Sequence, residues 1–290
     1  MNEQQPQQTP EIQRKTEGQD DRLMLREVLI HLKCLTRLEN NVLTIPFNGR
    51  LYKLKLPTPT QDASQLAFVD SGTFKDLPVL ITLSKLIAHN GVIVDVGAHI
   101  GNSTIFLTTQ CNAAMTLAFE PTDLSCTVLR ENLALNGVSN VKVYNFALGE
   151  AISRGCMLEQ QLNLVDSARI RIMPGKQGPV DIVSLDSLNL DKLDLLNIDV
   201  EGMQLDVLKG AKQTLKSAKP AVCIRLPYTG RGNPPKELAD MLNRELTQPK
   251  RLLTEYGYRI TQVTATQYIA IHGEDKELSD KLSSLTGGLS

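Results

Sequence analysis

The sequence predicts an α/β fold in which helices flank a seven-stranded, mostly parallel β-sheet. Three observations indicate it. Short runs of aliphatic residues, many of them β-branched, alternate with helical patterns from residue 91 onward. The first run, residues 92–96, passes directly into a glycine loop and a helix. Trp is absent and Phe and Tyr number six each, so the core must be aliphatic, as in parallel sheets that are buried on both faces.

The loop after the first strand has the pattern Asp95-x-Gly97-x-x-x-Gly101. Gly97 has no Cβ, so a ligand can approach the backbone closely, and the amides at the helix start point outward. The glycine spacing fits neither the dinucleotide fingerprint nor the phosphate loop. We expect six residues here to contact a different nucleotide-like ligand: Asp95, Gly97, Ala98, His99, Gly101 and Asn102.

The second strand, residues 115–119, ends in Glu120-Pro121. Glu120 follows the glycine loop by about twenty residues, where an acidic residue bonds the ribose hydroxyls of a nucleotide. A carboxylate suits this role because it can accept from both hydroxyls. The alternative is that Glu120 only complements the dipole of the helix that follows.

The remaining elements follow in order. Thr122 or Asp123 should cap a helix that ends at Asn136-Gly137. Further core strands are expected at 141–146, 193–200 and 221–226, and two closing strands at 258–263 and 267–271. Ala147 lies in the exit loop of the 141–146 strand and is expected to contact the ligand. Residues 152–172 show no strong period, 179–185 indicate a strand, and 236–255 a helix that contains Pro249.

The segments outside this sheet carry weaker patterns. Residues 1–20 are predicted to be a disordered tail, because they are rich in Gln, Pro and charge. Residues 21–90 form an N-terminal addition. It has a helix that docks on the main domain or meets a partner such as a second copy, a hairpin at 42–56 signalled by Asn48-Gly49, and a mainly helical stretch at 64–90. Residues 273–290 are predicted to be a second tail.

Composition excludes several classes of function. The chain has 31 basic and 32 acidic residues and a formal net charge of -1, so no basic surplus indicates nucleic acid or a membrane surface. Its five cysteines are scattered without a C-x-x-C pair, which favours reduced thiols and no metal site. No apolar run is long enough to span a membrane and no signal-peptide core is present. These features predict a cytoplasmic protein.

Three stretches resemble the FkbM family of S-adenosylmethionine (SAM)-dependent methyltransferases. The first is residues 94–101, which most methyltransferases share. The second joins 119–121 with 131–137. The third and most specific joins 194–202 with 207–211. The resemblance covers about residues 74–272. It implies a Rossmann-like class I methyltransferase fold, with residues 91–272 as the SAM-binding domain. It also implies SAM as cofactor and O-methylation of a hydroxyl on a sugar, glycolipid or polyketide-like small molecule.

Asp199 and Glu201 end the fourth core strand two residues apart, so they should face the same way in an extended segment. We expect Asp199 to orient the cofactor and Glu201 to act as general base or substrate anchor. Alternatively, Glu201 caps the helix that follows it. His99 is a weaker candidate for the base, because the family often has Asn at that position.

The chain departs from the family pattern at three positions. It has Asn197 where Lys is usual, Gln204 where Glu is usual, and Arg225 near a position that is usually acidic. These departures leave open a SAM-binding module without catalysis. A nicotinamide-dependent oxidoreductase with an unusual glycine loop is a third interpretation.

Overall fold

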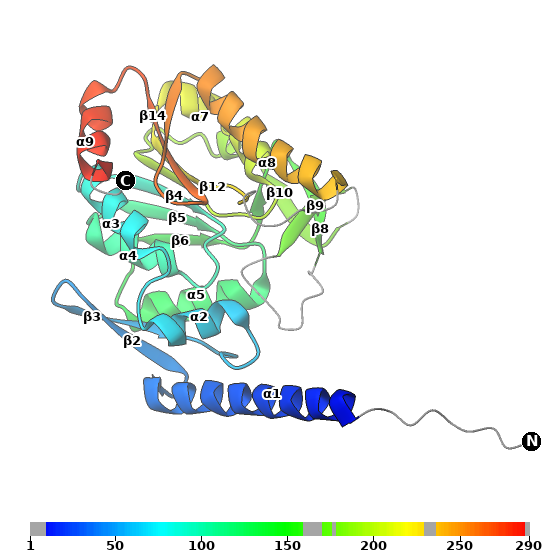
Figure 1. Cartoon of the computed structure of the whole chain (residues 1–290). Helices are drawn as coiled ribbons and strands as arrows, with labels where there is room; N and C mark the ends of the chain where they lie inside the picture. The colour runs from blue at the N-terminus through cyan, green and yellow to red at the C-terminus, as the bar shows by residue number, and fades with distance from the viewer. Residues whose placement is uncertain (1–9, 159–169, 176–177, 229–235, 288–290) are drawn as a thin grey trace, which may run out of the picture.

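The computed structural model describes residues 10–158, 170–175, 178–228 and 236–287, and the side chains of its first helix from Met24 onward (Figure 1). Its main element is a seven-stranded sheet with the order β13-β14-β12-β11-β4-β5-β6. The strands from β12 to β6 are parallel, and β14 is antiparallel to both neighbours. The seven strands are β4 (Val92–Val96), β5 (Met115–Phe119), β6 (Val141–Tyr144), β11 (Leu195–Ile198), β12 (Ala221–Arg225), β13 (Tyr258–Gln262) and β14 (Gln267–His272). The predicted α/β class is confirmed, and this strand arrangement is the Rossmann-like class I methyltransferase fold that the resemblance implies.

Helices cover both faces of this sheet, because side chains alternate along each strand. Ile93 packs in one core, and its neighbour Val94 packs in the other. The first core lies against α3, α4, α5 and α9, and the second against α6, α7 and α8. These helices are α3 (Leu77–Leu86), α4 (Asn102–Gln110), α5 (Asp123–Leu135), α6 (Gln204–Gly210), α7 (Lys212–Ser217), α8 (Lys236–Glu255) and α9 (Lys276–Thr286).

A second, four-stranded sheet with the order β7-β10-β8-β9 lies beside the main one (Figure 1). Its strands are β7 (Ala147–Leu148), β8 (Ser153–Leu158), β9 (Arg171–Pro174) and β10 (Val180–Val183); the short 3₁₀ helix η2 (Leu185–Leu188) follows. Only β10 was predicted as a strand. The others were missed because β7 has two residues, and because β8 and β9 each bury a single residue, which leaves no apolar alternation to detect. Residues 159–169 of the stretch without a period lie outside the described residues.

The N-terminal addition contains the predicted hairpin. β2 (Val42–Phe47) pairs with β3 (Arg50–Lys55), and the two-residue β1 (Leu38–Glu39) pairs with β2. Two asparagines of the family-like stretch 131–137 anchor it. Asn132 and Asn136 exchange hydrogen bonds with the backbone N–H and C=O groups of Lys55 and Lys53. These side chains thus fasten the hairpin to α5. The helical stretch that follows is α2 (Ala63–Ser71) and α3.

Both ends of the chain differ from the sequence prediction. Helix α1 (Pro10–Arg37) begins inside the segment expected to be a disordered tail, of which residues 1–9 lie outside the described residues. Its early start agrees with Pro at the first position and with good helix formers such as Gln, Glu, Arg and Lys after it. The predicted C-terminal tail contains α9, which is capped by Asp275 and packs Leu278 and Leu282 on the core. The i, i+4 spacing of these leucines is the signal that the prediction missed.

None of the helices that the structure describes has the length and hydropathy needed to cross a membrane. All five cysteines are free thiols. Within the described residues, no three His, Cys, Asp or Glu side chains are grouped as the ligands of a metal ion would be.

Candidate active site

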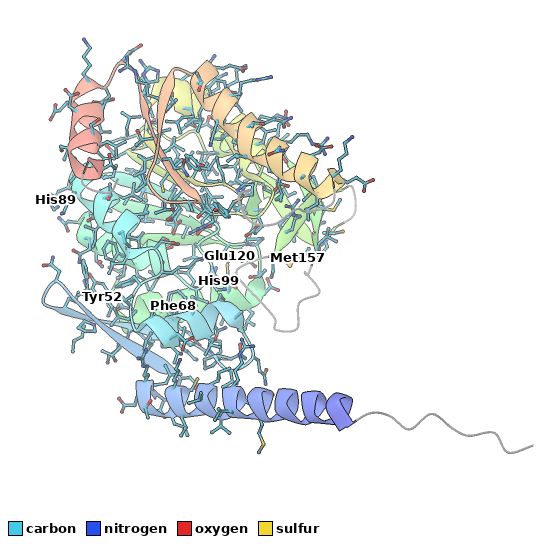
Figure 2. All side chains as sticks on the ribbon, in the orientation of Figure 1. Tyr52, Phe68, His89, His99, Glu120 and Met157 are labelled. Atoms are coloured by element: carbon cyan, nitrogen blue, oxygen red, sulfur yellow. The ribbon has the colours of Figure 1, made fainter. Side chains whose placement is uncertain are left out.

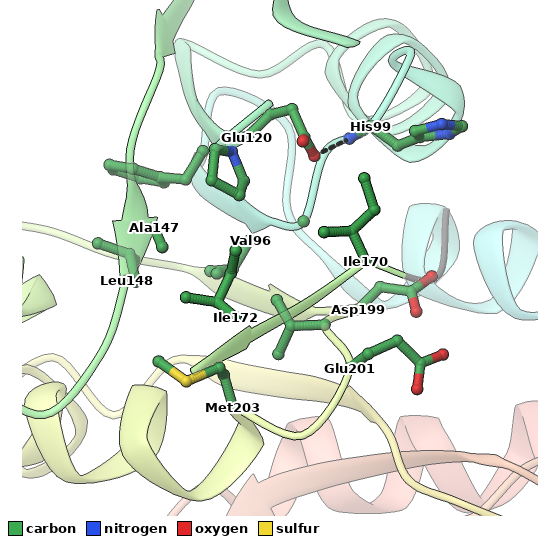
Figure 3. Close-up of a pocket in the computed structure, with 14 residues that line it drawn as sticks. Val96, His99, Glu120, Ala147, Leu148, Ile170, Ile172, Asp199, Glu201 and Met203 are labelled. Atoms are coloured by element: carbon green, nitrogen blue, oxygen red, sulfur yellow. Dashed lines mark hydrogen bonds between the residues drawn. The ribbon is translucent and has the colours of Figure 1, made fainter. Parts of the chain in front are cut away.

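A pocket of about 560 Å³, partly open to solvent, lies where β4, β5 and β11 end (Figure 3). In open α/β sheets, ligands bind at the carboxyl ends of the parallel strands. Its wall is mostly apolar, with carboxylates at Glu120, Asp199 and Glu201. The lining residues are Val96, Gly97, His99, Phe119, Glu120, Pro121, Ala147, Leu148, Ile170, Ile172, Asp199, Val200, Glu201 and Met203.

Gly97 occupies the turn of the predicted glycine loop with a φ of +82°, which a residue with a Cβ rarely adopts. A Cβ at this position would lie 2.2 Å from the backbone oxygen of Asp199. The expectation was that the missing Cβ makes room for a ligand. The structure adds a stronger constraint, because the loop after β11 packs directly against Gly97. The two strand-end loops are therefore in backbone contact at this residue.

Glu120 is buried and accepts three hydrogen bonds. Its Oε2 accepts from the backbone N–H of His99 at 2.9 Å, and its Oε1 accepts from the N–H and the hydroxyl of Thr122 at 3.0 and 2.6 Å. Burial raises the pKa of Glu120, and the bonds from Thr122 and His99 partly offset this. Thr122 is the N-cap residue of α5. Glu120 thus lines the pocket and also braces the start of a helix.

Four of the predicted ligand-contacting residues do not line the pocket: Asp95, Ala98, Gly101 and Asn102. Asp95 and Asn102 make side-chain hydrogen bonds that hold the loop in place. Asp95 is buried beneath it and accepts from Thr104 Oγ1 at 2.5 Å and Asn197 Nδ2 at 2.8 Å. Burial raises the pKa of Asp95 to about 6, against the lowering effect of these bonds. Asn102 exchanges two hydrogen bonds with the backbone of Lys75, next to α3.

His99 lines the pocket in the left-handed conformation, with a φ of +48°. Burial lowers the pKa of its ring to about 4. The imidazole is therefore neutral at pH 7. Asn tolerates this left-handed backbone conformation well, in agreement with the Asn that the resemblance implies at the position of His99.

Asp199 and Glu201 both line the pocket, and Figure 3 shows their carboxylates pointing to the same side, as their spacing predicted. Asp199 Oδ1 accepts from Arg225 Nε at 2.6 Å. Burial acts to raise the pKa of Asp199, but Arg225 and Lys75 outweigh burial and hold it below its usual value. Helix α6 begins at Gln204 with Met203 as its N-cap residue, so Glu201 does not occupy the cap position.

A family model for the methyltransferase FkbM domain matches residues 95–260, which is more than half of the chain. The chain belongs to the FkbM methyltransferase family. Methyltransferase sdnD of Sordaria araneosa is 29% identical in an alignment 160 residues long that covers 43% of this chain and 61% of that protein. Methyltransferase 1 of Beauveria bassiana is 27% identical in an alignment 143 residues long that covers 41% of this chain and 57% of that protein. The chain therefore spans about three fifths of the length of these relatives.

Among solved structures, two give partial matches to this chain. Methyltransferase FkbM from Methylobacillus flagellatus KT is 16% identical and matches with a TM-score of 0.40, over 75% of this chain and 63% of that one. TYW2 of M. jannaschii, solved in complex with AdoMet, is 13% identical and matches with a TM-score of 0.38, over 81% of this chain and 85% of that one.

The three departures from the FkbM pattern have local partners. Asn197 bonds Asp95, which is its direct neighbour in the β11–β4 register. The buried amide of Gln204 donates to the backbone oxygens of Val200 and Arg225 at 2.8 and 3.2 Å. A glutamate at this position could donate to neither oxygen unless it were protonated.

Arg225 forms the widest network. Besides Asp199, it donates to Thr266 Oγ1 at 3.0 Å and pairs with Asp76, the N-cap residue of α3. Sequence reasoning noted Arg225 but missed Asp76, which lies 149 residues away in the chain. No local pattern connects them. The network ties the N-terminal addition to the wall of the pocket.

Proposed function

We propose that this FkbM family member is a SAM-dependent methyltransferase that methylates a hydroxyl group on a small molecule, such as a sugar, a glycolipid or a polyketide-like compound. One observation carries the proposal. A single pocket at the ends of the parallel strands has a carboxylate near its glycine loop, an apolar wall, and two carboxylates at the end of β11. This distribution matches a ligand with ribose hydroxyls, a flat apolar ring and a cationic end.

The residues present fit SAM. Each carboxylate oxygen can accept two hydrogen bonds, so Oε2 of Glu120, which accepts one from His99, retains capacity for a ribose hydroxyl. Phe119, Pro121 and Ala147 offer an apolar surface for the adenine ring. Glu201 supplies negative charge for the cationic groups, and Asp199, held in place by Arg225, supplies a further hydrogen-bond acceptor. SAM contributes a methyl group bound to a positively charged sulfur, which a nucleophilic oxygen can attack.

We assign proton removal to Glu201. The acceptor hydroxyl must lose its proton as its oxygen forms the new bond, and a carboxylate oxygen within hydrogen-bond reach can take that proton. Asp199 is a poorer base because its pKa is held below the usual value. The neutral ring of His99 is the second candidate. Ile170, Ile172 and Met203 also line the pocket and would exclude water from the reacting groups.

A SAM-binding module without catalysis is the second candidate, and the ion pair between Arg225 and Asp199 favours it. An ion-paired carboxylate with a lowered pKa is a weak base, so it can hold a ligand without removing a proton. We also propose a small-molecule or glycan acceptor, no nucleic-acid substrate, and a cytoplasmic site of action, for which the five free thiols are the supporting observation.

Calorimetry with SAM, S-adenosylhomocysteine, NAD and ATP tests the proposal. We expect SAM and S-adenosylhomocysteine to bind and to raise the melting temperature, because a ligand that binds only the folded state stabilises it. NAD and ATP should do neither. Binding of NAD without SAM would support the oxidoreductase interpretation. SAM binding without methyl transfer to any member of a panel of hydroxylated acceptors would favour the module without catalysis.

A further inference from the structure

The C-terminal half of α1 is attached to the body of the protein along one side only. Lys33 Nζ lies 2.6 Å from Asp70 Oδ1, and Arg37 donates to the backbone oxygens of Val69 and Asp70 at the end of α2. Cys34 packs against the core from the same side. Figure 1 shows α1 lying along the outside of the molecule, below the hairpin and α2, with its first turns extending past them.

The other side of this helix segment is apolar and exposed. Of the fourteen large hydrophobic side chains that are exposed in the described residues, six fall within the twelve residues from Met24 to Leu35. They retain 45–78% of their accessible surface: Met24, Leu25, Val28, Leu29, Leu32 and Leu35. Figure 2 shows side chains of this segment projecting away from the body as well as toward it. Single exposed leucines are ordinary, but a contiguous group of this size marks an interaction surface.

The spacing within the group is that of a helix–helix seam. Leu25, Val28, Leu32 and Leu35 follow one another at intervals of three, four and three residues, which is the a/d pattern of a coiled coil. Met24 and Leu29 flank the seam and widen it. At 100° per residue the six side chains share one face within an arc of about 140°, with Arg37 on the opposite side and Lys33 at the edge next to Leu29.

We propose that this face, the α1 stripe, is a dimerisation surface on which the α1 helices of two copies of the chain pack against each other. A two-fold axis brings the same face of both copies together, so a self-complementary apolar seam satisfies it. From their exposed fractions, the six side chains present on the order of 600 Å² per copy. A pair would bury about 1,200 Å², the lower end of the range for specific interfaces.

The charges on the helix favour a second copy over a membrane surface. Amphipathic helices that bind anionic lipid depend on a surplus of Lys and Arg on their polar face. Between Met24 and Arg37 the charged residues are Arg26, Glu27, Lys33 and Arg37. Lys33 and Arg37 are bound to the body, and Arg26 and Glu27 cancel each other. The solvent-facing side of the segment therefore carries no surplus of basic side chains to attract anionic lipid.

The test is sedimentation velocity of the full chain from about 1 to 100 µM, with the double variant Leu25→Glu/Leu32→Glu. We expect the wild type to shift from one to two chain masses within this range, since an interface of this size gives modest affinity. The variant should stay monomeric, with dimerisation at least about 100-fold weaker, because it places carboxylates in the seam. The matched control Leu51→Glu/Ile152→Glu changes two equally exposed leucine and isoleucine side chains elsewhere and should dimerise like the wild type.

The replaced side chains are exposed, so we expect every variant to keep the wild-type melting temperature when it is measured at a concentration below the dimerisation range. Leu35→Glu, at the most exposed position of the stripe, provides an independent second variant. A wild type that stays monomeric to 100 µM would overturn the proposal, and so would a dimer that both stripe variants retain. Co-sedimentation of a monomeric wild type with phosphatidylcholine vesicles, lost in Leu25→Glu/Leu32→Glu, would instead assign the stripe to a lipid surface.

Discussion

Two carboxylates of the same pocket are held in opposite ways. Glu120, after β5, accepts three hydrogen bonds from neutral donors, two of them backbone N–H groups. Asp199, after β11, is paired with the guanidinium of Arg225, which also pairs with Asp76. Neutral donors orient a carboxylate and leave it able to accept from a ligand. An ion pair neutralises it. This contrast supports the proposed placement of the ligand hydroxyls at the β5 end of the pocket.

The largest effect is expected at Gly97, where the two ends of the pocket meet. Gly97→Ala places a Cβ 2.2 Å from the backbone oxygen of Asp199 and forces a positive φ on a residue that resists it. We expect loss of more than about 3 kcal/mol of unfolding free energy and loss of SAM binding. Urea unfolding and calorimetry measure both.

Gly137→Ala is the matched control, because Gly137 has a φ of +64° and open space around its Cβ position. It should cost only about 1 kcal/mol, the price of the backbone conformation alone. Equal losses in both variants would show that the contact between the two strand-end loops contributes nothing.

The next effect concerns the ion pair at the β11 end. Arg225→Gln leaves Asp199 and Asp76 without their cation, and we expect a loss of about 2–4 kcal/mol at pH 7. This is somewhat less than for a fully buried pair, because the Asp199 side chain is 30% exposed. Asp199 has a lowered pKa when folded, so its pair stabilises the protein above the unfolded pKa, and this contribution disappears as the pH falls through the folded pKa. The loss caused by Arg225→Gln should therefore shrink in acid.

Lys209→Gln breaks the exposed pair between Lys209 and Glu150 and should cost less than about 1 kcal/mol. Urea unfolding at pH 7 and pH 3 gives all of these differences. A loss for Arg225→Gln no larger than that for Lys209→Gln would contradict the assigned role of the ion pair.

The sequence predicted features that lie on one stretch of chain, and it missed contacts between residues that are far apart in the chain. The central strands β4, β5, β11 and β12 were found because each is buried on both faces and is mostly aliphatic. Gly97, Glu120 and Asp199 were found because each lies at a strand end, where spacing along the chain locates it. Asp76 and Thr104 were missed, because their partners Arg225 and Asp95 are adjacent only in three dimensions. Asn102 was expected at the ligand and lies outside the pocket, because adjacency to a glycine loop in sequence does not determine which way a side chain points.

A third carboxylate, Asp95, lies beneath the glycine loop and makes the unfolding free energy depend on pH. Its pKa is raised from 3.8 to about 6, so the neutral form is favoured in the folded protein. The stability that this group contributes is complete below pH 3.8 and is lost as the pH rises through 6. The loss is about 3 kcal/mol, since each pKa unit is worth about 1.4 kcal/mol. Asp95→Asn should abolish this step, so its stability relative to the wild type should increase between pH 4 and pH 7.

Thr104→Val is the informative companion, because the Thr104 hydroxyl donates to Asp95 and favours its ionised form. Without that bond the step should move to higher pH. Urea unfolding at half-unit pH intervals resolves both changes. An Asp95→Asn profile that parallels the wild type would mean that Asp95 is already ionised throughout this range.

The smallest effect is expected at Glu120. Glu120→Gln replaces one oxygen with an amide N–H₂, which must face a ligand hydroxyl or the N–H groups of His99 or Thr122. We expect SAM affinity to fall by about 1–3 kcal/mol, which is roughly five- to 150-fold. Because these protein donors also lose an acceptor, the unfolding free energy should fall as well. The SAM affinity of Glu120→Gln therefore does not by itself show whether Glu120 contacts the ligand or only positions the loop.

Thr122→Val makes that separation. It removes the hydroxyl that donates to Oε1 of Glu120 and leaves both carboxylate oxygens and the His99 bond in place. If Glu120 accepts from the ribose, Thr122→Val should cost about 1 kcal/mol of stability and change SAM affinity by less than about threefold. Calorimetry and thermal melting of the two variants side by side decide the matter. Equal losses of affinity would mean that Glu120 acts only by positioning the loop, and an unchanged affinity in Glu120→Gln would remove it from the ligand site.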